Sequence, residues 1–393
     1  MDKVLLDCND CCGCEACFQV CPTKAISMEH DKYGFTYSKI NTQLCIDCGK
    51  CQQVCPALNP VKFESKGENY VLSAFANDDN KRMSGSSGGV FGLLAEFVLS
   101  KGGIVYGAAF DENLQLRHIE VSDVVYLPHI LKSKYIQSHI GTTFISVRKR
   151  LSQGKTVLFC GTPCQCLALY NCLGRKHYDN LILVDFICHG VPSQKFFDKS
   201  IMSWESKTNR KVEGFSFRYK CDSDKTEAGL RYWRLKTKDG REYKGRYIKF
   251  PFYYAYLRYM FFRPSCYSCQ YCKIERCTDI TLGDFWGLRN IKNISIKEFN
   301  KGYSILIVNT AMGKELISNL DLSTKEYPIH TAVDNNYAYT HPTIQSEESK
   351  HFFNDYDKLP WADLERKYMI IKTDLVHRGF RFIKRMIKKW LRR

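Results

Sequence analysis

The sequence lacks any long apolar run. No stretch of its 393 residues approaches the roughly 18 consecutive apolar residues that a membrane-spanning helix requires. The N-terminus, MDKVLLDCND, has no apolar signal core, so we expect a cytoplasmic protein without a spanning helix. The chain also exceeds the roughly 100 to 200 residues of a usual single domain, which predicts more than one hydrophobic core.

Cysteine, by contrast, is abundant, with 20 residues. Without an export signal, and with cysteines crowded at three-residue intervals, metal ligation explains them better than disulfides do. The run Cys-x2-Cys-x2-Cys-x3-Cys-Pro occurs twice, at 11–22 and 45–56. Such a run wraps around a 4Fe-4S cube, and in two-cluster ferredoxins its fourth cysteine binds the other cluster. The pattern predicts one cluster on Cys11, Cys14, Cys17 and Cys55 and a second on Cys45, Cys48, Cys51 and Cys21.

Other features of the first 60 residues fit this interpretation. Zinc sites take four ligands with a longer central spacer, whereas eight cysteines here repeat one cluster loop. Cys8 and Cys12 fall outside the register, and we interpret them as spare thiols. The residues between the two runs predict a short hairpin that turns near 32–34.

An alternation of helices and strands is predicted beyond Pro60. Apolar patterns indicate helices at 90–99, 143–151 and up to Leu173, and strands at 103–110, 156–160 and 181–187. This order predicts an α/β domain with a parallel or mixed sheet and ligand loops at the strand ends. SGSSGG at 84–89 and GTPC at 161–164 each precede a helix, where free N–H groups favour a phosphate. Either turn alone is a weak indicator.

A third group of cysteines, CYSCQYCKIERC at 266–277, leaves two ligand sets open. The local set is Cys266, Cys269, Cys272 and Cys277. In the dispersed set, the first two of these join Cys164 and Cys188 from the strand-end turns. Either set would hold a 4Fe-4S cluster, and zinc remains an alternative because four thiolates suit both.

Taken in order, the motifs resemble the coenzyme F420 hydrogenase/dehydrogenase beta-subunit family. They are the paired cysteine runs, SGSSGG, KSKYIQS at 132–138, GTPCQ at 161–165, CHG at 188–190, the Cys-x2-Cys at 266–269 and DITLGDFWG at 279–287. The resemblance covers about residues 1–355. It implies an FAD-binding domain with its own 4Fe-4S cluster, fused to a ferredoxin that supplies electrons. It also favours the dispersed ligand set, with Cys272 and Cys277 as extras.

The resemblance further implies candidate site residues. Those for cofactor binding are Ser87, Gly88, Gly89, Lys134, Tyr135, Gln137, Ser138, Gly161, Thr162, Pro163, Gln165, Gly283 and Asp284. Lys134 would balance phosphate or reduced-flavin charge, although a solvated basic loop explains it equally well. His189 is a candidate proton donor, because imidazole titrates near about pH 6.5; orienting the turn by a hydrogen bond is the alternative. These two residues are the weak catalytic candidates.

We therefore expect an iron-sulfur, flavin-dependent oxidoreductase. Iron-sulfur cubes pass single electrons, whereas most organic reductions need two, and a flavin converts between the two regimes. Electrons from a low-potential donor, such as a ferredoxin or reductase, would reach FAD and then a small-molecule or lipid-linked substrate. Some related members sit among surface-polysaccharide genes. The alternative is a non-catalytic electron-transfer subunit that serves a partner enzyme.

The predicted organisation has four segments. They are a two-cluster ferredoxin-like α+β module at 1–62, two parts of a flavin-binding redox domain at 68–152 and 153–355, and a tail at 356–393. Residues 366–393 contain eleven Lys or Arg and one Asp, so they carry +10 of the net charge of +17. Each cluster and a flavin would subtract about 2 from the remaining +7, which argues against a nucleic-acid partner.

The tail predicts a basic amphipathic helix. Ile383, Met386, Ile387, Trp390 and Leu391 recur at helical spacing among eight Lys or Arg between Arg378 and Arg393. Such a helix either docks on an anionic membrane surface, at the inner face of the membrane, or packs its apolar stripe on the protein body.

Overall fold

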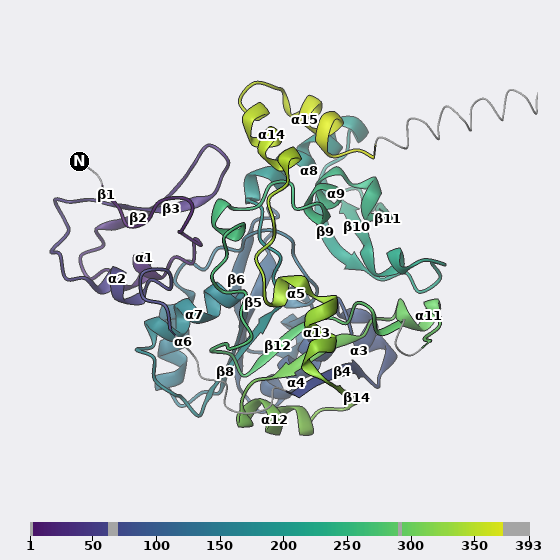
Figure 1. Cartoon of the computed structure of the whole chain (residues 1–393), viewed down its shortest axis with the longest axis horizontal. Helices are drawn as coiled ribbons and strands as arrows, with labels where there is room; N and C mark the ends of the chain where they lie inside the picture. The colour runs from purple at the N-terminus through teal and green to yellow at the C-terminus, as the bar shows by residue number, and fades with distance from the viewer. Residues whose placement is uncertain (1–2, 62–69, 290–292, 372–393) are drawn as a thin grey trace, which may run out of the picture.

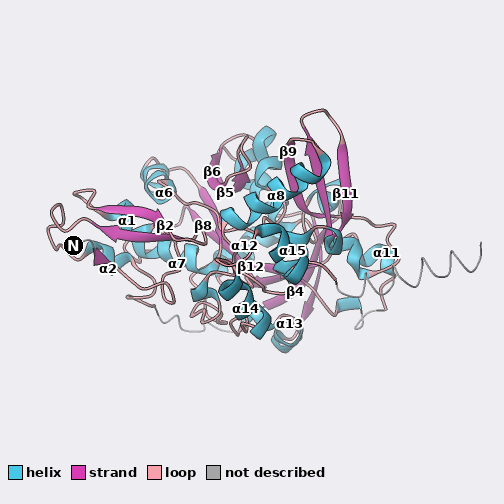
Figure 2. Cartoon of the chain, turned by 90° about the horizontal axis from the view of Figure 1, so that it is seen from above, coloured by secondary structure: helices cyan, strands magenta, loops and turns pink. Residues whose placement is uncertain are grey.

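The computed structural model describes residues 3–61, 70–289 and 293–371. A small N-terminal module lies beside a larger α/β body (Figure 1), at one end of an elongated molecule (Figure 2). No helix in these three ranges is long and apolar enough to cross a membrane. The boundary predicted between 62 and 68 and the basic helix predicted beyond 378 lie outside the described residues.

The module contains a small sheet and two short helices. Its strands β1 (Lys3–Val4), β2 (Ile26–His30) and β3 (Thr36–Ile40) lie in the order β1-β3-β2, and its helices are α1 (Ala16–Val20) and α2 (Lys50–Val54). Strands β2 and β3 pair antiparallel around a turn in which the Asp31 carboxylate accepts the N–H groups of Tyr33 and Phe35. The predicted hairpin is confirmed.

The body is built on an eight-stranded mixed sheet of order β14-β4-β13-β12-β8-β7-β5-β6. Neighbours from β12 through β8 and β7 to β5 run parallel, and the remaining pairs are antiparallel. The strands are β4 (Tyr70–Ala76), β5 (Ile104–Phe110), β6 (Leu116–Val121), β7 (Val157–Gly161), β8 (Leu181–Phe186), β12 (Ile280–Asp284), β13 (Ser304–Val308) and β14 (Leu322–Tyr327). The predicted α/β domain with a mixed sheet is confirmed.

Helices cover both faces of this sheet. Along β7, Leu158 packs with α4 (Val90–Ser100), whereas Val157 and Phe159 pack with α6 (Thr143–Ser152) and α7 (Pro163–Cys172). Successive side chains of a strand point to opposite faces, so both faces bury apolar residues and the strands read as continuous apolar runs. These three helices were predicted to within one or two residues.

A second, three-stranded sheet was not predicted. It comprises β9 (Val212–Tyr219), β10 (Tyr232–Thr237) and β11 (Glu242–Arg246), and an aromatic core joins it to α8 (Gln194–Thr208), α9 (Pro251–Leu257), α14 (Glu347–Asp355) and α15 (Trp361–Tyr368). The other helices are α3 (Asp79–Ser84), α5 (Leu127–Ile130), α11 (Ile296–Phe299), α12 (Ala311–Ser318) and α13 (Ile329–Asn335).

Candidate functional site

Three neighbouring strands deliver the predicted site residues to one place. Strands β7, β8 and β12 are parallel, so their carboxyl ends meet at one edge of the sheet. Strand β7 leads into Cys164, β8 leads into Cys188 and His189, and β12 ends at Asp284. We call this region the sheet edge. Polar residues after parallel strands form ligand sites in many α/β proteins.

The module docks beside the sheet edge through side chains that the sequence did not single out. Gln19 of α1 accepts the N–H groups of Phe144 and Ile145, at 2.9 and 3.3 Å. These are free donors in the first turn of α6, whose own N-cap residue makes no side-chain bond. Glu15, which is buried, accepts the Gly141 N–H and pairs with His139 at 2.8 Å. The module therefore completes the end of a helix in the body.

The four cysteines predicted for the first cluster line one small cavity of the module. They are Cys11, Cys14, Cys17 and Cys55, and Leu5, Met28 and Ser38 contribute to the same walls. Burial, together with the neighbouring thiols, raises the pKa of Cys17 to about 12 and that of Cys55 to about 11. A thiol with so high a pKa becomes a thiolate only when a cation offsets the charge, so this donor set fits an iron-sulfur cube.

The second predicted set lies nearer the surface. Cys45 and Cys48 are close enough to Cys51 to raise its pKa, after the larger effect of burial. Cys48 is exposed, as are Leu44 and Ile46, the latter by 64%. The fourth predicted ligand, Cys21, contacts the Thr23 hydroxyl and the Ala25 N–H.

The third group gathers at the sheet edge. Burial raises the pKa of Cys266, and the nearby thiols of Cys188 and Cys269 add to the rise. Gly190 adopts φ +121°, and a Cβ there would lie 3.0 Å from the Cys266 Cβ, so the turn after β8 touches the 266–277 loop. Cys164 is electrostatically coupled to Cys269 as well. Within the described ranges, no three His, Cys, Asp or Glu side chains are arranged to hold a single metal ion.

The two extra cysteines of this loop differ in position. Cys272 contacts Cys269 and lies near Cys188. Cys277 is buried beside Asp185, whose carboxylate raises the pKa of this thiol after the larger effect of burial. Arg276, which pairs with Asp185 at 2.9 Å, is its other charged neighbour.

Cys12 links the module to the sheet edge. Its thiol interacts with those of Cys14 and Cys164, and these contacts lower the pKa of Cys12 well below the usual value. The nearby Tyr271 hydroxyl is buried without a hydrogen-bond partner among the residues that the structure describes. The pKa of Tyr271 is raised by burial and by thiols from both sides, among them Cys12 and Cys164. The first and third cysteine groups therefore meet at this contact.

Beside the cysteines, the sheet edge carries an excess of positive charge. Arg218, which is 2% exposed, forms a bidentate pair with Asp284, and its Nε is buried without a partner. In the described part of the chain, no carboxylate pairs with Lys132, Lys220 or Arg231. Aromatic rings surround these cations: Tyr135 stacks on Tyr256, His189 on Tyr259, and Arg231 lies over Trp286.

Comparison with known proteins agrees with this arrangement. Residues 154–327 match the family that comprises the C terminus of the coenzyme F420 hydrogenase/dehydrogenase beta subunit, and residues 10–59 match a 4Fe-4S dicluster domain. The chain carries both of these domains. The predicted family is thereby confirmed, as is an iron-sulfur chain related to oxidoreductase subunits with two 4Fe-4S clusters in its N-terminal domain.

Two relatives show how much of each is shared. An uncharacterised polyferredoxin-like protein of Methanocaldococcus jannaschii is 37% identical over 75 residues, which cover 16% of this chain and 45% of the relative. The chain thus spans less than half the length of that curated relative. A chain of the F420-reducing NiFe hydrogenase complex of Methanosarcina barkeri is 19% identical, with a TM-score of 0.44 over 69% of this chain and 86% of that one.

The beta-subunit domain contains both the cysteines of the sheet edge and the Arg218–Asp284 pair. It also contains Gly161, Thr162, Pro163 and Gln165. Thr162 and Gln165 form a capping box at the start of α7, so their side chains satisfy the first-turn donors of that helix. Gly161 is close-packed, because a Cβ there would lie 2.8 Å from the Phe159 ring. Gly283 is packed against Ile187 in the same way.

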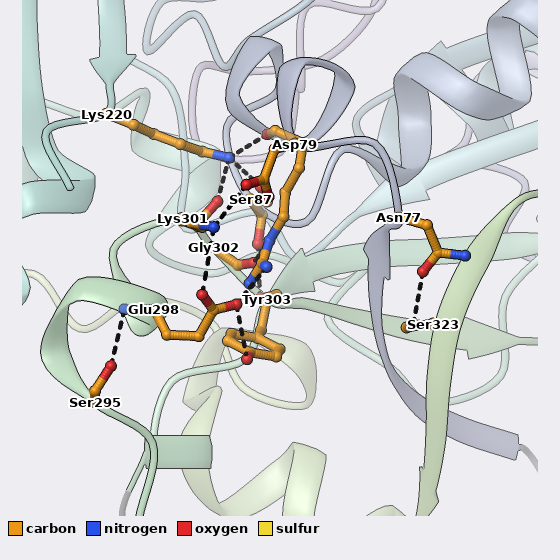
Figure 3. Close-up of polar contacts among 11 residues, drawn as sticks. Asn77, Asp79, Ser87, Lys220, Ser295, Glu298, Lys301, Gly302, Tyr303 and Ser323 are labelled. Carbon is orange, nitrogen blue, oxygen red and sulfur yellow. Dashed lines mark hydrogen bonds and ion pairs between the residues drawn. The ribbon is translucent and has the colours of Figure 1, made fainter.

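The Ser-Gly turn at 84–89 precedes the beta-subunit domain in sequence but packs against it (Figure 3). Ser87 donates to the Tyr303 carbonyl, and the Gly88 N–H donates to Ser304. Lys220 reaches over from β9 and donates to the carbonyls of Arg82, Ser87 and Lys301. Gly89 is the N-cap residue of α4. The turn is thus held by internal bonds, with a buried cation beside it.

The remaining predicted residues divide between the two regions. Gln137 serves the module interface, because its amide donates to the carbonyls of Cys12 and Gly13. Ser138 is buried and bonds His118 at 2.8 Å. Lys134 donates to the carbonyls of His129 and Leu131, and burial lowers its pKa to about 7.

His189 lies at the sheet edge, as expected. Burial lowers its pKa, and the neighbouring Asp284 opposes that effect. Its carbonyl accepts the Thr343 hydroxyl. The turn that carries His189 is therefore tied to the segment before α14, and the stacked ring faces the aromatic side of the site.

Proposed function

We propose that this chain is an iron-sulfur flavoprotein oxidoreductase that passes electrons from a low-potential donor to an organic substrate. The observation that carries the proposal is the contact of Cys12 with both Cys14 and Cys164. It brings the thiols of the module within direct reach of the thiols at the sheet edge. Electron transfer needs such short separations between redox groups, and this contact supports a continuous route.

A third 4Fe-4S cluster is part of the proposal. Its ligands would be the dispersed set Cys164, Cys188, Cys266 and Cys269, since these thiols interact with one another whereas Cys277 lies among Asp185 and Arg276. A four-iron cube spreads its thiolates farther apart than one zinc ion does, so the lack of a single-ion geometry among the described residues suits the cube.

FAD is the proposed cofactor of the sheet edge. When bound, a flavin exchanges electrons singly with clusters and in pairs with organic substrates. Tyr135, Tyr256 and Trp286 offer ring faces for a planar group, and the unpartnered Arg218 Nε offers a donor to an anionic one. Lys132, Lys220 and Arg231 supply further positive charge, which also fits a phosphorylated or lipid-linked glycan as substrate.

Electrons would enter at the second cluster. Its loop is the exposed part of the module, with Leu44, Ile46 and Cys48 open to solvent. An exposed apolar rim of this kind suits brief docking of a donor protein such as a ferredoxin. The same exposure favours the second candidate function, a non-catalytic subunit that passes electrons to a partner enzyme.

Anaerobic purification, with iron, sulfide and flavin measured on one sample, tests the proposal. About twelve irons and one FAD are expected for three 4Fe-4S clusters and a flavin. About eight irons without flavin, the content of two clusters, would overturn it. The electron-carrier function would then take its place, and reduction of a substrate would require the partner enzyme.

A further inference from the structure

Arg263 is a buried cation at the junction between the module and the body. Its side chain is 0% exposed. Nε donates to the Cys11 carbonyl at 2.6 Å, Nη2 to the Thr36 carbonyl at 2.8 Å, and Nη1 to the Gln137 amide oxygen at 3.0 Å. The guanidinium also lies over the rings of Tyr37, at 4.3 Å, and Phe35. It therefore holds three segments together.

No carboxylate among the described residues pairs with Arg263. The other deeply buried arginines each have one: Arg82 pairs with Glu298, Arg218 with Asp284 and Arg276 with Asp185. An isolated charge in a protein interior is strongly unfavourable unless an opposite charge offsets it. The acceptors of Arg263 are two carbonyls and an amide, all neutral. Its counter-charge must come from another group.

Cysteines supply the nearby groups that can become negative. Cys11, Cys12 and Cys266 are the thiols that favour the charged form of Arg263, together with the Tyr37 hydroxyl. Cys11 belongs to the first predicted set and Cys266 to the third. Gly13, in the loop between them, adopts φ +65°, and a Cβ there would lie 2.6 Å from the Arg263 Nη1. The close approach of the guanidinium to this loop thus requires glycine at position 13.

We propose that Arg263 is the shared counter-charge of two iron-sulfur clusters, the first cluster of the module and the third cluster at the sheet edge. The inference rests on the proposed function for the existence of that third cluster. A four-thiolate cube carries about two negative charges when oxidised and gains another on reduction. A fixed positive charge close to both cubes stabilises both reduced forms. Arg263 is a positioning residue that raises both reduction potentials and ties docking of the module to cluster loading.

The test is an anaerobic redox titration followed by electron paramagnetic resonance, with iron measured on each sample. Arg263→Gln removes the charge and keeps a hydrogen-bond donor. We expect the potentials of the first and third clusters to move to more negative values. The second cluster, on the exposed side of the module, should keep its potential and serves as an internal control. Unchanged potentials in an iron-replete Arg263→Gln protein would overturn the inference.

Two further variants make the test decisive. Arg263→Lys restores the charge without the planar fork, so both potentials should return toward those of the unaltered protein. If Arg263→Gln fails to retain iron, recovery of the iron in Arg263→Lys supports the inference, and failure to recover it overturns it. Arg82→Gln is the matched control: Arg82 is also buried and lies over two aromatic rings, but it has its own carboxylate. It should leave the cluster potentials unchanged.

The iron content of the unaltered protein separates two kinds of failure. About eight irons instead of about twelve would remove the third cluster and with it the proposed function. About twelve irons with potentials that ignore residue 263 would leave the proposed function standing and remove only the role of Arg263.

Discussion

The guanidinium of Arg218 grips the carboxylate of Asp284 at two points, with distances of 2.7 Å from Nη2 to Oδ1 and 2.6 Å from Nη1 to Oδ2. The pair joins the second sheet to the end of β12, and Arg218 is buried. Burial opposes the charge, but Asp284 raises the pKa of Arg218 well above its usual value. The geometry of the sheet edge depends on this pair.

Asp284→Asn should be strongly destabilising. It leaves the Arg218 charge buried without a carboxylate, which typically costs about 3 to 5 kcal/mol. The measurement is the free energy of unfolding from chemical denaturation. Asp239→Asn is the control, because Asp239 pairs with Arg210 at the surface and exposed pairs contribute under about 1 kcal/mol. Equal losses in the two variants would contradict this account of the sheet edge.

Lys134 should give the stability a pH dependence at mildly alkaline pH. Its folded-state pKa of about 7 lies below the value of about 10.4 in an unfolded chain. Between these values the unfolded chain binds one more proton at this site, so stability increases as the pH rises through the window. Below pH 7 both states are protonated and the contribution is constant. Burial is the main cause of the low pKa, and the nearby charge of Lys132 adds to it.

The measurement compares unfolding free energies of the unaltered protein and Lys134→Met at several pH values from 7 to 9. We expect the difference to move in favour of the unaltered protein as the pH rises. Parallel curves would mean that Lys134 stays charged in the folded protein.

The ligand sets can be separated by single substitutions. Cys164→Ser should lower the iron content by about four, the content of one cube, because Cys164 lies among the thiols of the sheet edge. Cys277→Ser should not, since Cys277 lies beside Asp185. Cys12→Ser should also retain its iron if Cys12 links the sets without being a ligand. Iron loss in Cys277→Ser with none in Cys164→Ser would support the local ligand set.

Gln19→Ala tests the docking of the module. It removes the acceptor for the Phe144 and Ile145 N–H groups, and loss of such a cap costs about 1 kcal/mol. Hydrogen exchange of residues 143–145 should become faster. Gln52→Ala is the matched control, because Gln52 is exposed on α2 of the same module. Faster exchange in both variants would indicate a general loosening of the module.

The sequence allowed the main sheet and its ligand turns to be predicted. Strands such as Val157–Gly161 and Leu181–Phe186 are buried on both faces, so their apolar runs are distinctive. The paired cysteine runs indicated their clusters because ligand spacing is local. The second sheet escaped prediction because β9 to β11 have mixed polar and aromatic sequences, and an aromatic core formed by distant segments stabilises them.

Contacts between segments distant in sequence could not be predicted either. Cys12 seemed a spare thiol because its partner Cys164 lies 152 positions away in the sequence. Arg263 stood in no motif, and its role follows only from three acceptors on separate segments. Gln137 was predicted to hold a cofactor or substrate, whereas its amide contacts the module. A side chain's type indicates which bonds it can form, but only the fold determines its partners.

The most direct test of the electron route is anaerobic stopped-flow reduction of the flavin by a reduced low-potential ferredoxin. The unaltered protein is compared with Cys48→Ser, which alters only the exposed second cluster. We predict rapid bleaching of the flavin in the unaltered protein and at least about a tenfold slower reaction in the variant, since the route would lose its entry point. Equal rates in the two proteins, or no bleaching in either, would contradict the account.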